Sequence, residues 1–452
     1  MNRRYFIKTS AALLTTLHGG IAFSKTRERL RLGIIGTGLR GQVHLAELLK
    51  RADVDVTAIC DIEPFMLHAA LKIFATASKP KPQIYTGSVE AWREMLVKAK
   101  LDAVIIATPW ELHAPQAIAA MEAKVAVGCE VVAGITLDDH WQVLRAQRAS
   151  GTPYMLLENV CYRRDVMAIM NMVRQGLFGE LVHVEGGYQH DLRAVKFNSG
   201  TPGKPYGGGV EFGSKGWSES IWRTPHAVTR NGELYPSHGI GPCAMWLDIN
   251  RGNRFTRLTS YASKARGLAA YVKKNAPADH PNANAKFALG DVVQTQLQCA
   301  NGETVLLTHD TSLPRPYSLG FRVQGTEGLW MDVNKSLYLE GKSAEGKSQP
   351  HRFEPAQAWL DKYDHPLWQK YAGQAKDAGH GGMDFFVLHA FVEAVKRDHA
   401  MPIDIFDALS WSAITPLSEE SIAKENRTLD FPDFTDGAWQ NRKRIFALDG
   451  QY

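Results

Sequence analysis

The chain of 452 residues has few cysteines and no pattern that would use them in pairs. No CxxC motif is present, and an odd, dispersed set of cysteines indicates neither a disulfide framework nor a zinc site. We therefore predict no metal site, and we expect each cysteine to be a small buried hydrophobic residue. The five cysteines are Cys60, Cys129, Cys161, Cys243 and Cys299.

The sequence also lacks a large excess of one charge and any internal repeat. Its 52 basic and 47 acidic residues give a net charge of +5, and without residues 1–24 the balance is 49 to 47. Because no basic stripe is present, nucleic-acid binding is not expected. A hydrophobic content of 44% and a charged content of 22% are those of a soluble globular protein. The length predicts two domains, or one domain with a large insertion.

The N-terminal segment has no hydrophobic run long enough to span a membrane. The paired arginines Arg3 and Arg4 precede a mildly apolar stretch, residues 11–23, that contains Thr, Gly and His. This stretch is too short and too polar for a membrane span, but the pattern is typical of a twin-arginine export signal. We predict a signal peptide over residues 1–24 and a periplasmic protein. The alternative is a frayed basic tail.

A glycine-rich turn, GTGLRG at residues 36–41, lies between a strand-like run at residues 32–35 and a helix-like run at residues 42–50. In such a GxGxxG turn one glycine allows the tight bend, the second lets the backbone approach a pyrophosphate, and the third lets helix and strand pack closely. The helix N-terminus then offers free N–H groups to the phosphates. The three glycines are Gly36, Gly38 and Gly41.

An acidic residue ends the next predicted strand. The apolar run at residues 54–59 is followed by Asp61, which lies 20 residues after Gly41. A carboxylate at this spacing binds the ribose hydroxyls of a dinucleotide and repels a 2′-phosphate. The sequence therefore predicts NAD(H) rather than NADP(H) as the cofactor. Leu39 and Arg40 belong to the same turn, and we expect Arg40 to stack on adenine or to meet a phosphate.

Strand and helix patterns continue to alternate as far as residue 157. Helices are predicted over residues 88–100, 111–123 and 136–149, with Ser88 and Thr136 as caps, and buried strands over residues 102–107, 125–128 and 154–157. This alternation predicts a Rossmann domain, a doubly wound parallel sheet, over residues 30–160. Its ligand crevice lies at the carboxyl ends of the strands, where Glu130 and Asn159 are placed.

Longer alternating strands predict a second domain of another kind, an α+β domain with a mostly antiparallel open sheet over residues 161–426. The predicted strands are residues 181–190, 257–262, 292–299, 304–309 and 321–324, and the predicted helices are residues 165–175 and 383–397. Residues 200–216 are rich in Gly, Pro and Ser and predict a surface loop or lid. Residues 427–452 are expected to wrap the surface as an ordered tail.

Several short motifs together resemble the Gfo/Idh/MocA family of two-domain NAD(P)-dependent proteins. More narrowly they resemble glycoside hydrolase family 109, whose founding activity is α-N-acetylgalactosaminidase. The resemblance runs from about residue 30 to residue 317. The motifs are GTGLRG at 36–41, TPWELH at 108–113, EV at 130–131, LENVCY at 157–162, YQHDLR at 188–193 and YPSHGIGP at 235–242.

The resemblance implies that the dinucleotide site also includes Trp110, His113 and Val131, beside Glu130 and Asn159. Ordinary members of the wider family carry Glu-Lys-Pro at Glu130, with the lysine as the proton shuttle beside the nicotinamide. Val131 replaces that lysine here, so a plain alcohol dehydrogenase is disfavoured.

The resemblance further implies an NAD-dependent, exo-acting glycosidase. The sugar is transiently oxidised at carbon 3, the glycosidic oxygen leaves by elimination, water adds, and the sugar is reduced again. Such a route needs imidazole or phenol groups at its proton transfers rather than two flanking carboxylates. We expect His238 to act at the 3-hydroxyl and Tyr188, activated by Arg193 or Arg223, at carbon 2. The residues expected to bind substrate are Tyr188, Arg223, Tyr235, His238 and Tyr317.

Each of these residues also has a structural interpretation. His238 could be a hydrogen-bonding residue of its turn, Tyr188 a half-buried aromatic, and His190 with Asp191 a charge-assisted pair. Two other functions remain open, namely a sugar dehydrogenase that exchanges NAD(H) with solution and a non-catalytic NAD or sugar sensor. The expected partner is a small glycoside or a glycan terminus, with no membrane span, and a homo-oligomer is left open.

Overall fold

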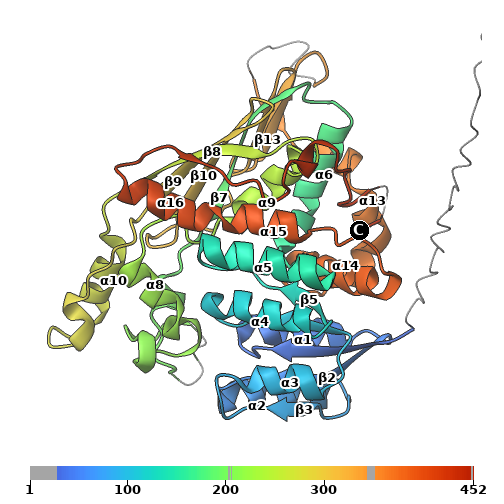
Figure 1. Ribbon diagram of the computed structural model, residues 1–452. Coiled ribbons are helices and arrows are strands. Elements are labelled where there is room, and N and C mark those ends of the chain that lie inside the picture. The colour runs from blue at the N-terminus through green and yellow to red at the C-terminus, as the bar shows by residue number, and fades with distance from the viewer. Residues whose placement is uncertain (1–27, 202–203, 205, 344–351, 449–450) are drawn as a thin grey trace, which may run out of the picture.

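The computed structural model describes residues 28–201, 204, 206–343, 352–448 and 451–452. The predicted signal peptide lies outside these residues. Two β-sheets organise the described chain, with the N-terminal sheet and its helices at the bottom of Figure 1 and the second sheet at the top. Helices α15 (Ile405–Ser412) and α16 (Ile414–Ala423) lie between them, so the last third of the chain joins the two halves.

The first sheet is parallel, with the strand order β3-β2-β1-β4-β5-β6. Its strands are β1 (Leu30–Ile35), β2 (Val54–Cys60), β3 (Gln83–Tyr85), β4 (Ala103–Ile106), β5 (Ala126–Cys129) and β6 (Tyr154–Leu156). Its helices are α1 (Leu39–Leu49), α2 (Pro64–Thr76), α3 (Ala91–Lys98), α4 (Trp110–Glu122) and α5 (Leu137–Ser150). Every residue of β4, β5 and β6 is buried, as continuous apolar runs require. The predicted Rossmann fold is confirmed.

The two predicted helix caps have different outcomes. Thr136 accepts from the backbone N–H of Asp139, so the predicted cap is confirmed. The Asp139 side chain accepts in return, which completes a capping box. Ser88 does not cap a helix. Its hydroxyl accepts from the backbone N–H of Glu90 at 3.1 Å, and α3 begins only at Ala91. Ser88 therefore stabilises the turn before the helix.

The second sheet has the order β14-β13-β12-β11-β7-β10-β9-β8-β15 among the described residues. Only the β7–β10 pair is parallel there, so the predicted mostly antiparallel sheet is confirmed. Its strands are β7 (Leu181–Gln189), β8 (Phe255–Ala262), β9 (Val293–Cys299), β10 (Thr304–Asp310), β11 (Arg322–Gly325), β12 (Gly328–Met331), β13 (Ser336–Leu339), β14 (Glu354–Pro355) and β15 (Leu429–Asp430).

One helix of the second domain packs unusually closely on the sheet. Helix α9 (Ser237–Trp246) lies against β7 where three glycines meet. A Cβ atom on Gly239 would lie 2.4 Å from the backbone N of Gly187, and one on Gly186 would lie 2.6 Å from the Gly239 carbonyl oxygen. The absence of side chains here brings the first turn of α9 to the end of β7. His238 and Tyr188 therefore come together.

The part of the chain after residue 161 also contains several helices. They include α6 (Arg164–Arg174), α7 (Arg193–Lys196), α8 (Arg223–Thr229), α10 (Gly267–Asn275), α12 (Gln357–Lys362), α13 (Pro366–Ala375) and α14 (Met383–Arg397). Helix α14 has the predicted bounds and packs back on the first domain, where the ring of Phe391 lies against Gly128 of β5. In the described part of the C-terminal tail, Phe434 and Phe446 are buried. Its β15 also extends the second sheet beside β8.

All five cysteines are buried free thiols, as expected. Within the described ranges no helix is both long enough and apolar enough to cross a bilayer.

Candidate active site

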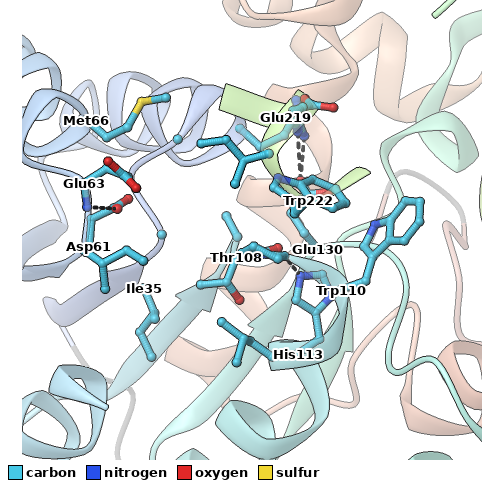
Figure 2. Close-up of a pocket in the computed structure, with 18 of the residues that line it drawn as sticks. Ile35, Asp61, Glu63, Met66, Thr108, Trp110, His113, Glu130, Glu219 and Trp222 are labelled. Carbon is cyan, nitrogen blue, oxygen red and sulfur yellow. Dashed lines mark hydrogen bonds and ion pairs between the residues drawn. The ribbon is translucent and has the colours of Figure 1, made fainter. Parts of the chain in front are cut away.

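A cavity of about 230 Å³ lies between the two domains, at the carboxyl ends of the Rossmann strands (Figure 2). One wall comes from the ends of β1, β2, β4 and β5 and the loops that follow them. The other wall comes from a loop and short helices of the second domain. The predicted residues in the lining are Gly36, Gly38, Leu39, Arg40, Asp61, Trp110, His113, Glu130, Val131, Arg223 and Tyr235.

The glycine turn has the geometry that a pyrophosphate needs. Gly36 has a positive φ of 89°, and a Cβ atom on Gly41 would lie 2.0 Å from the Gly36 carbonyl oxygen. A Cβ on Gly38 would meet no atom within 4 Å, so the backbone there faces open space. Gly38 is the N-cap of α1 and provides no side-chain cap, which leaves the helix N–H groups available to an anion. These residues fit a dinucleotide.

Asp61 holds the turn as well as facing the cavity. Its Oδ2 accepts from the backbone N–H of Thr37 at 2.6 Å and from the Thr37 hydroxyl at 3.1 Å, and its Oδ1 accepts from the N–H of Glu63 at 2.9 Å. A carboxylate has room for about four hydrogen bonds. Asp61 can therefore still bind ribose hydroxyls, and its negative charge disfavours a 2′-phosphate.

Arg40 and Glu130 form the centre of a buried charge network beneath the cavity. The Arg40 Nη2 donates to Glu130 Oε1 at 2.7 Å and to Asp384 Oδ1 of α14 at 3.2 Å. His44 Nε2 lies 2.5 Å from the same Glu130 oxygen. Burial alone would raise the pKa of Glu130, but Arg40 and His44 hold it well below its usual range. The Arg40 guanidinium pairs with two carboxylates and the residue also lines the cavity, so its contact with adenine or a phosphate stays a prediction.

Asn159 also belongs to this network rather than to the cavity wall. Its side-chain amide donates to Asp384 Oδ1 at 2.8 Å, and Asp384 is fully buried. His380, in the glycine-flanked turn before α14, lies with Nδ1 2.7 Å from Asp384 Oδ2. Burial would raise the pKa of Asp384, but His380 and Arg40 lower it strongly. A residue more than 200 positions away thus fixes the amide of Asn159.

His113 joins two strand ends. Its Nδ1 lies 2.5 Å from the carbonyl oxygen of Val132, and its Nε2 lies 2.7 Å from that of Thr108. Burial lowers the pKa of this imidazole in spite of the two carbonyl contacts. His113 therefore holds the loops after β4 and β5 together while its ring lines the cavity.

The predicted substrate residues form one aromatic cluster beside the cavity. The ring of Tyr188 lies 4.6 Å from Tyr235, 5.2 Å from His238 and 6.4 Å from Tyr317, measured between centroids. Tyr235 is 6.0 Å from Trp110, which lines the dinucleotide cavity. Residues from three distant parts of the chain thus surround the point where the two sites meet.

His238 is held by a buried carboxylate. Its Nδ1 lies 2.8 and 2.9 Å from the two carboxylate oxygens of Glu158, whose side chain is 0% exposed. Glu158 also accepts from the N–H of Val160 at 2.9 Å, which fixes its orientation. A carboxylate at Nδ1 favours the tautomer with the proton on that nitrogen, which leaves Nε2 free to accept a proton.

Tyr188 is paired with His190 at the end of β7. The Tyr188 Oη and the His190 Nδ1 are 3.1 Å apart. Burial raises the pKa of Tyr188, and the nearby Arg223 opposes that rise. Burial and Arg223 both lower the pKa of His190, which makes this imidazole a weaker base, so the shift itself does not favour transfer of the phenol proton to it. Arg223 is thus the cation that acts on Tyr188.

Two sequence interpretations of this strand end were wrong. Asp191 does not pair with His190. Its carboxylate binds the guanidinium of Arg193 at 2.7 and 2.8 Å. Because Arg193 is occupied in this way, it does not act on Tyr188.

Arg223 lies among aromatic rings and is only slightly exposed. Its guanidinium carbon lies 5.2 Å from the Trp110 ring centroid and 5.4 Å from that of Tyr235, and its Nε is 2.7 Å from Glu219 Oε2. Burial lowers the pKa of Arg223, but Glu219, Tyr235 and Tyr188 raise it by more. A fixed cation therefore stands between the dinucleotide cavity and the tyrosine cluster.

Sequence reasoning gave Glu158 no role. Its neighbour Asn159 had been chosen instead, and both follow β6. A signal was available, since a carboxylate at the carboxyl end of a Rossmann strand faces the ligand crevice. The contact with His238 joins residues 80 positions apart and depends on the packing of α9. In the part of the chain that the structure describes, no group of three or more His, Cys, Asp or Glu residues could hold a metal ion.

Comparisons with known proteins agree with this two-domain site. Residues 30–156 match the family model described as "Oxidoreductase family, NAD-binding Rossmann fold", and residues 162–441 match "Glycosyl hydrolase 109, C-terminal domain". Similar solved structures include levoglucosan dehydrogenase in complex with NADH, with a TM-score of 0.61 and 20% identity, covering 90% of this chain and 100% of that one. At this identity the likeness concerns the fold.

Sequence relatives are much closer. The chain is 62% identical over 457 residues to a "Glycosyl hydrolase family 109 protein" of Stenotrophomonas maltophilia, covering 100% of this chain and 99% of the relative. It is 49% identical over 426 residues to an "Alpha-N-acetylgalactosaminidase" of Tannerella forsythia, covering 94% of this chain and 90% of the relative. The chain belongs to glycosyl hydrolase family 109 and is an NAD-dependent glycoside hydrolase.

Proposed function

We propose that this hydrolase is an exo-acting α-N-acetylgalactosaminidase that works by transient oxidation of the sugar. Two relatives that bear this activity as their name, from Tannerella forsythia and Shewanella oneidensis, are 49% and 39% identical to the chain. The observation that carries the proposal is the pairing of His238 with buried Glu158 beside Tyr188, at the junction of the sugar and dinucleotide sites.

The first proton transfer is assigned to His238. Bound NAD supplies a reversible hydride acceptor at carbon 3 of the sugar. His238 takes the 3-hydroxyl proton on Nε2 as that carbon becomes a ketone, and the Glu158 carboxylate stabilises the resulting imidazolium through Nδ1. At the end of the cycle His238 returns the proton, so the sugar leaves with no net oxidation.

The second proton transfer is assigned to Tyr188. A ketone at carbon 3 acidifies the proton on carbon 2. Tyr188 acts at carbon 2 as a phenolate, which the positive charge of Arg223 stabilises, and it takes the carbon 2 proton. Its own proton leaves to solvent by way of His190 Nδ1, 3.1 Å away. The electron pair left on carbon 2 forms a double bond to carbon 1 while the glycosidic oxygen leaves and takes a proton from water. The hydroxide so formed adds at carbon 1, Tyr188 returns its proton to carbon 2, and the steps at carbon 3 reverse.

The remaining residues of the cluster position the sugar. Arg223 and Tyr235 are placed to hold hydroxyls or the N-acetyl group, because both face the cavity from the second domain. Tyr317 is 49% exposed at the outer edge of the cluster, where it can contact the sugar as it enters. The alternative of a sugar dehydrogenase fits less well, since Val131 stands where those enzymes carry their lysine.

A direct assay tests this proposal. Purified protein is mixed with p-nitrophenyl α-N-acetylgalactosaminide without added NAD, and nitrophenol release is followed. We expect turnover, and we expect dinucleotide in the supernatant after the protein is denatured. The matched p-nitrophenyl α-galactoside tests the need for the N-acetyl group. An absolute requirement for added NAD, with net NADH formation, would favour the dehydrogenase.

We also propose that the protein is exported to the periplasm by the twin-arginine route. The support is the pair Arg3 and Arg4 before the apolar stretch at residues 11–23. This route carries folded proteins, so NAD can be bound in the cytoplasm and carried out. Replacing both arginines by lysine should leave the precursor in the cytoplasm. Normal periplasmic recovery of that variant would contradict the proposal.

A further inference from the structure

A segment of the second domain, residues 212–222, crosses over the dinucleotide cavity and forms the wall opposite the Rossmann strands. Ser218, Glu219, Ile221 and Trp222 line the cavity together with residues that follow β2. Figure 2 shows Glu219 and Trp222 across the hollow from Asp61 and Glu63. We call this segment the strap. It contains the short helices η2 (Gly213–Lys215) and η3 (Ser218–Ile221).

The strap stacks an aromatic ring on the Rossmann domain. The ring centroids of Trp217 and Phe65 are 5.5 Å apart, and the ring planes differ by 22°. Phe65 lies in the first turn of α2, four residues after Asp61, and lines the cavity. This pair therefore joins the two domains next to the carboxylate that faces the ribose.

The cavity wall around Phe65 is apolar and open to solvent. Ile62 is 51% exposed, Phe65 is 38% exposed and Val89 is 63% exposed, although all three line the cavity. In a Rossmann site the pyrophosphate lies at the N-terminus of α1 and the adenosine half lies beyond the acid at the end of β2. Apolar side chains at that end suit the flat face of an adenine ring.

The strap is held in its own domain before it meets the Rossmann domain. The backbone N–H of Trp217 donates to the Asn198 carbonyl and to the Ser220 hydroxyl, both at 2.9 Å, and Ser220 is fully buried. The indole lies against Gly200, where a Cβ atom would be 2.8 Å from Trp217 Cδ1. Trp217 is therefore presented in a fixed position toward Phe65.

We propose that Trp217 and Phe65 form a latch that closes the adenine end of the cleft and slows the release of NAD. This inference rests on the proposed function, in which the cofactor must stay bound through each cycle. With the rings stacked, the dinucleotide lies between the glycine turn on one side and the strap on the other. Release then requires the strap to separate from α2, and retention depends on a contact between domains as well as on the Rossmann residues.

The latch can be tested by cofactor exchange in the resting enzyme. Protein with its bound NAD is mixed with excess isotopically labelled NAD, filtered at intervals and denatured, and the released dinucleotide is analysed by mass spectrometry. We expect Trp217→Ala and Phe65→Ala each to speed exchange about tenfold, a factor in the range of a lost aromatic pair. The double variant should be no faster than the faster single variant, because either change breaks the same contact.

Matched variants separate the latch from a general loss of packing. Trp217→Phe keeps a ring in place and should exchange nearly as slowly as the wild type. Tyr261→Ala removes a 58% exposed aromatic on β8, away from the cavity lining, and should change nothing. If Trp217→Ala does not fold, the NAD exchange rates of Phe65→Ala and Trp217→His are compared with the wild-type rate instead.

The possible outcomes are distinct. Wild-type exchange rates in both Trp217→Ala and Phe65→Ala, or additive effects in the double variant, would overturn the latch and leave the proposed function intact. Wild-type protein that releases no dinucleotide on denaturation would overturn the proposed function and the latch together.

Discussion

His238 and Glu158 form a paired imidazole and carboxylate, with Nδ1 2.8 and 2.9 Å from the two carboxylate oxygens. The pair joins the first turn of α9 in the second domain to the segment that follows β6 in the first. The side chain of His238 is 16% exposed, whereas that of Glu158 is 0% exposed. The histidine can thus meet a substrate while its partner stays protected from water.

This pairing predicts that Glu158→Gln will lower activity. The amide of glutamine can still contact Nδ1 of His238, but it carries no negative charge to stabilise the imidazolium. It can also turn its N–H group, instead of its oxygen, toward Nδ1. We expect kcat to fall about 10²–10⁴-fold, the range for impaired acid–base catalysis. NAD content, measured after denaturation, should match the wild type. Activity within threefold of the wild type would show that His238 does not depend on the carboxylate.

His238 and Tyr188 are expected to act in different steps. His238→Ala should abolish the transient NADH signal on mixing with substrate, because the 3-hydroxyl proton has no acceptor. Tyr188→Phe should still allow that signal but stall elimination, so the absorbance of the reduced nicotinamide should rise and persist. Both variants should turn over about 10²–10⁴-fold more slowly. Wild-type enzyme that neither exchanges the carbon 2 proton with deuterated solvent nor shows a nicotinamide signal would rule out the redox route.

Asp61→Ala should weaken NAD retention. The change removes a charged acceptor for ribose hydroxyls and also the contacts that hold Thr37 in the turn. We expect a loss of about 1–3 kcal/mol in binding free energy, as for other charge-assisted hydrogen bonds. The measurement is the dinucleotide content of purified protein after dialysis. Recovery of NADP from the wild type would contradict the cofactor assignment.

Gly239→Ala should separate α9 from β7. The new methyl group would lie 2.4 Å from the backbone N of Gly187. Backbone atoms cannot move aside as the end of a flexible side chain can, so the helix and the strand must separate. We expect a loss of about 1–3 kcal/mol in unfolding free energy, measured by urea denaturation, together with reduced activity as His238 shifts. Gly373→Ala is the matched control, because Gly373 lies in α13 with no atom within 4 Å of its Cβ position. That change should stabilise the protein by about 0.4–1 kcal/mol.

Glu233 gives a pH-dependent stability. Burial raises the pKa of this carboxyl from 4.5 to about 8, against one contact from the N–H of Tyr235 at 3.2 Å. The folded state therefore binds more protons than the unfolded state between these values. The stabilisation that Glu233 gives the folded state is complete below pH 4.5 and is lost as the pH rises through 8. The unfolding free energy falls by about 1.4 kcal/mol for each unit by which the two pKa values differ.

The neutral variant Glu233→Gln removes this titration. Its unfolding free energy should therefore change less than that of the wild type between pH 4.5 and 8. Urea denaturation of both proteins at pH 5, 7 and 9 measures the difference. A constant difference in unfolding free energy across these three values would show that Glu233 does not titrate within the folded protein.

The local part of the fold was predictable from the sequence. The glycine turn at residues 36–41, the acid at Asp61 and the continuous apolar strands predict a Rossmann domain, because each is a signal within one strand–helix unit. The capping box at Thr136 and the bounds of α14 were predictable for the same reason. The strands β12 and β13 were not predicted, since four residues are too few to show a period. Helices α9, α15 and α16 were not predicted either, since they have buried residues on several faces and show no clear period.

The sequence by itself determined the chemistry available to this protein: an NAD-binding turn, a tyrosine and histidine set in place of the usual lysine, and no metal or disulfide pattern. Only the tertiary structure decided which of these groups act together. The packing of Gly239 on Gly187 brings His238 beside Tyr188 and onto Glu158, and α14 brings Asp384 to Arg40. Contacts between residues 80 to 344 positions apart leave no local pattern, because they depend on how separate elements pack.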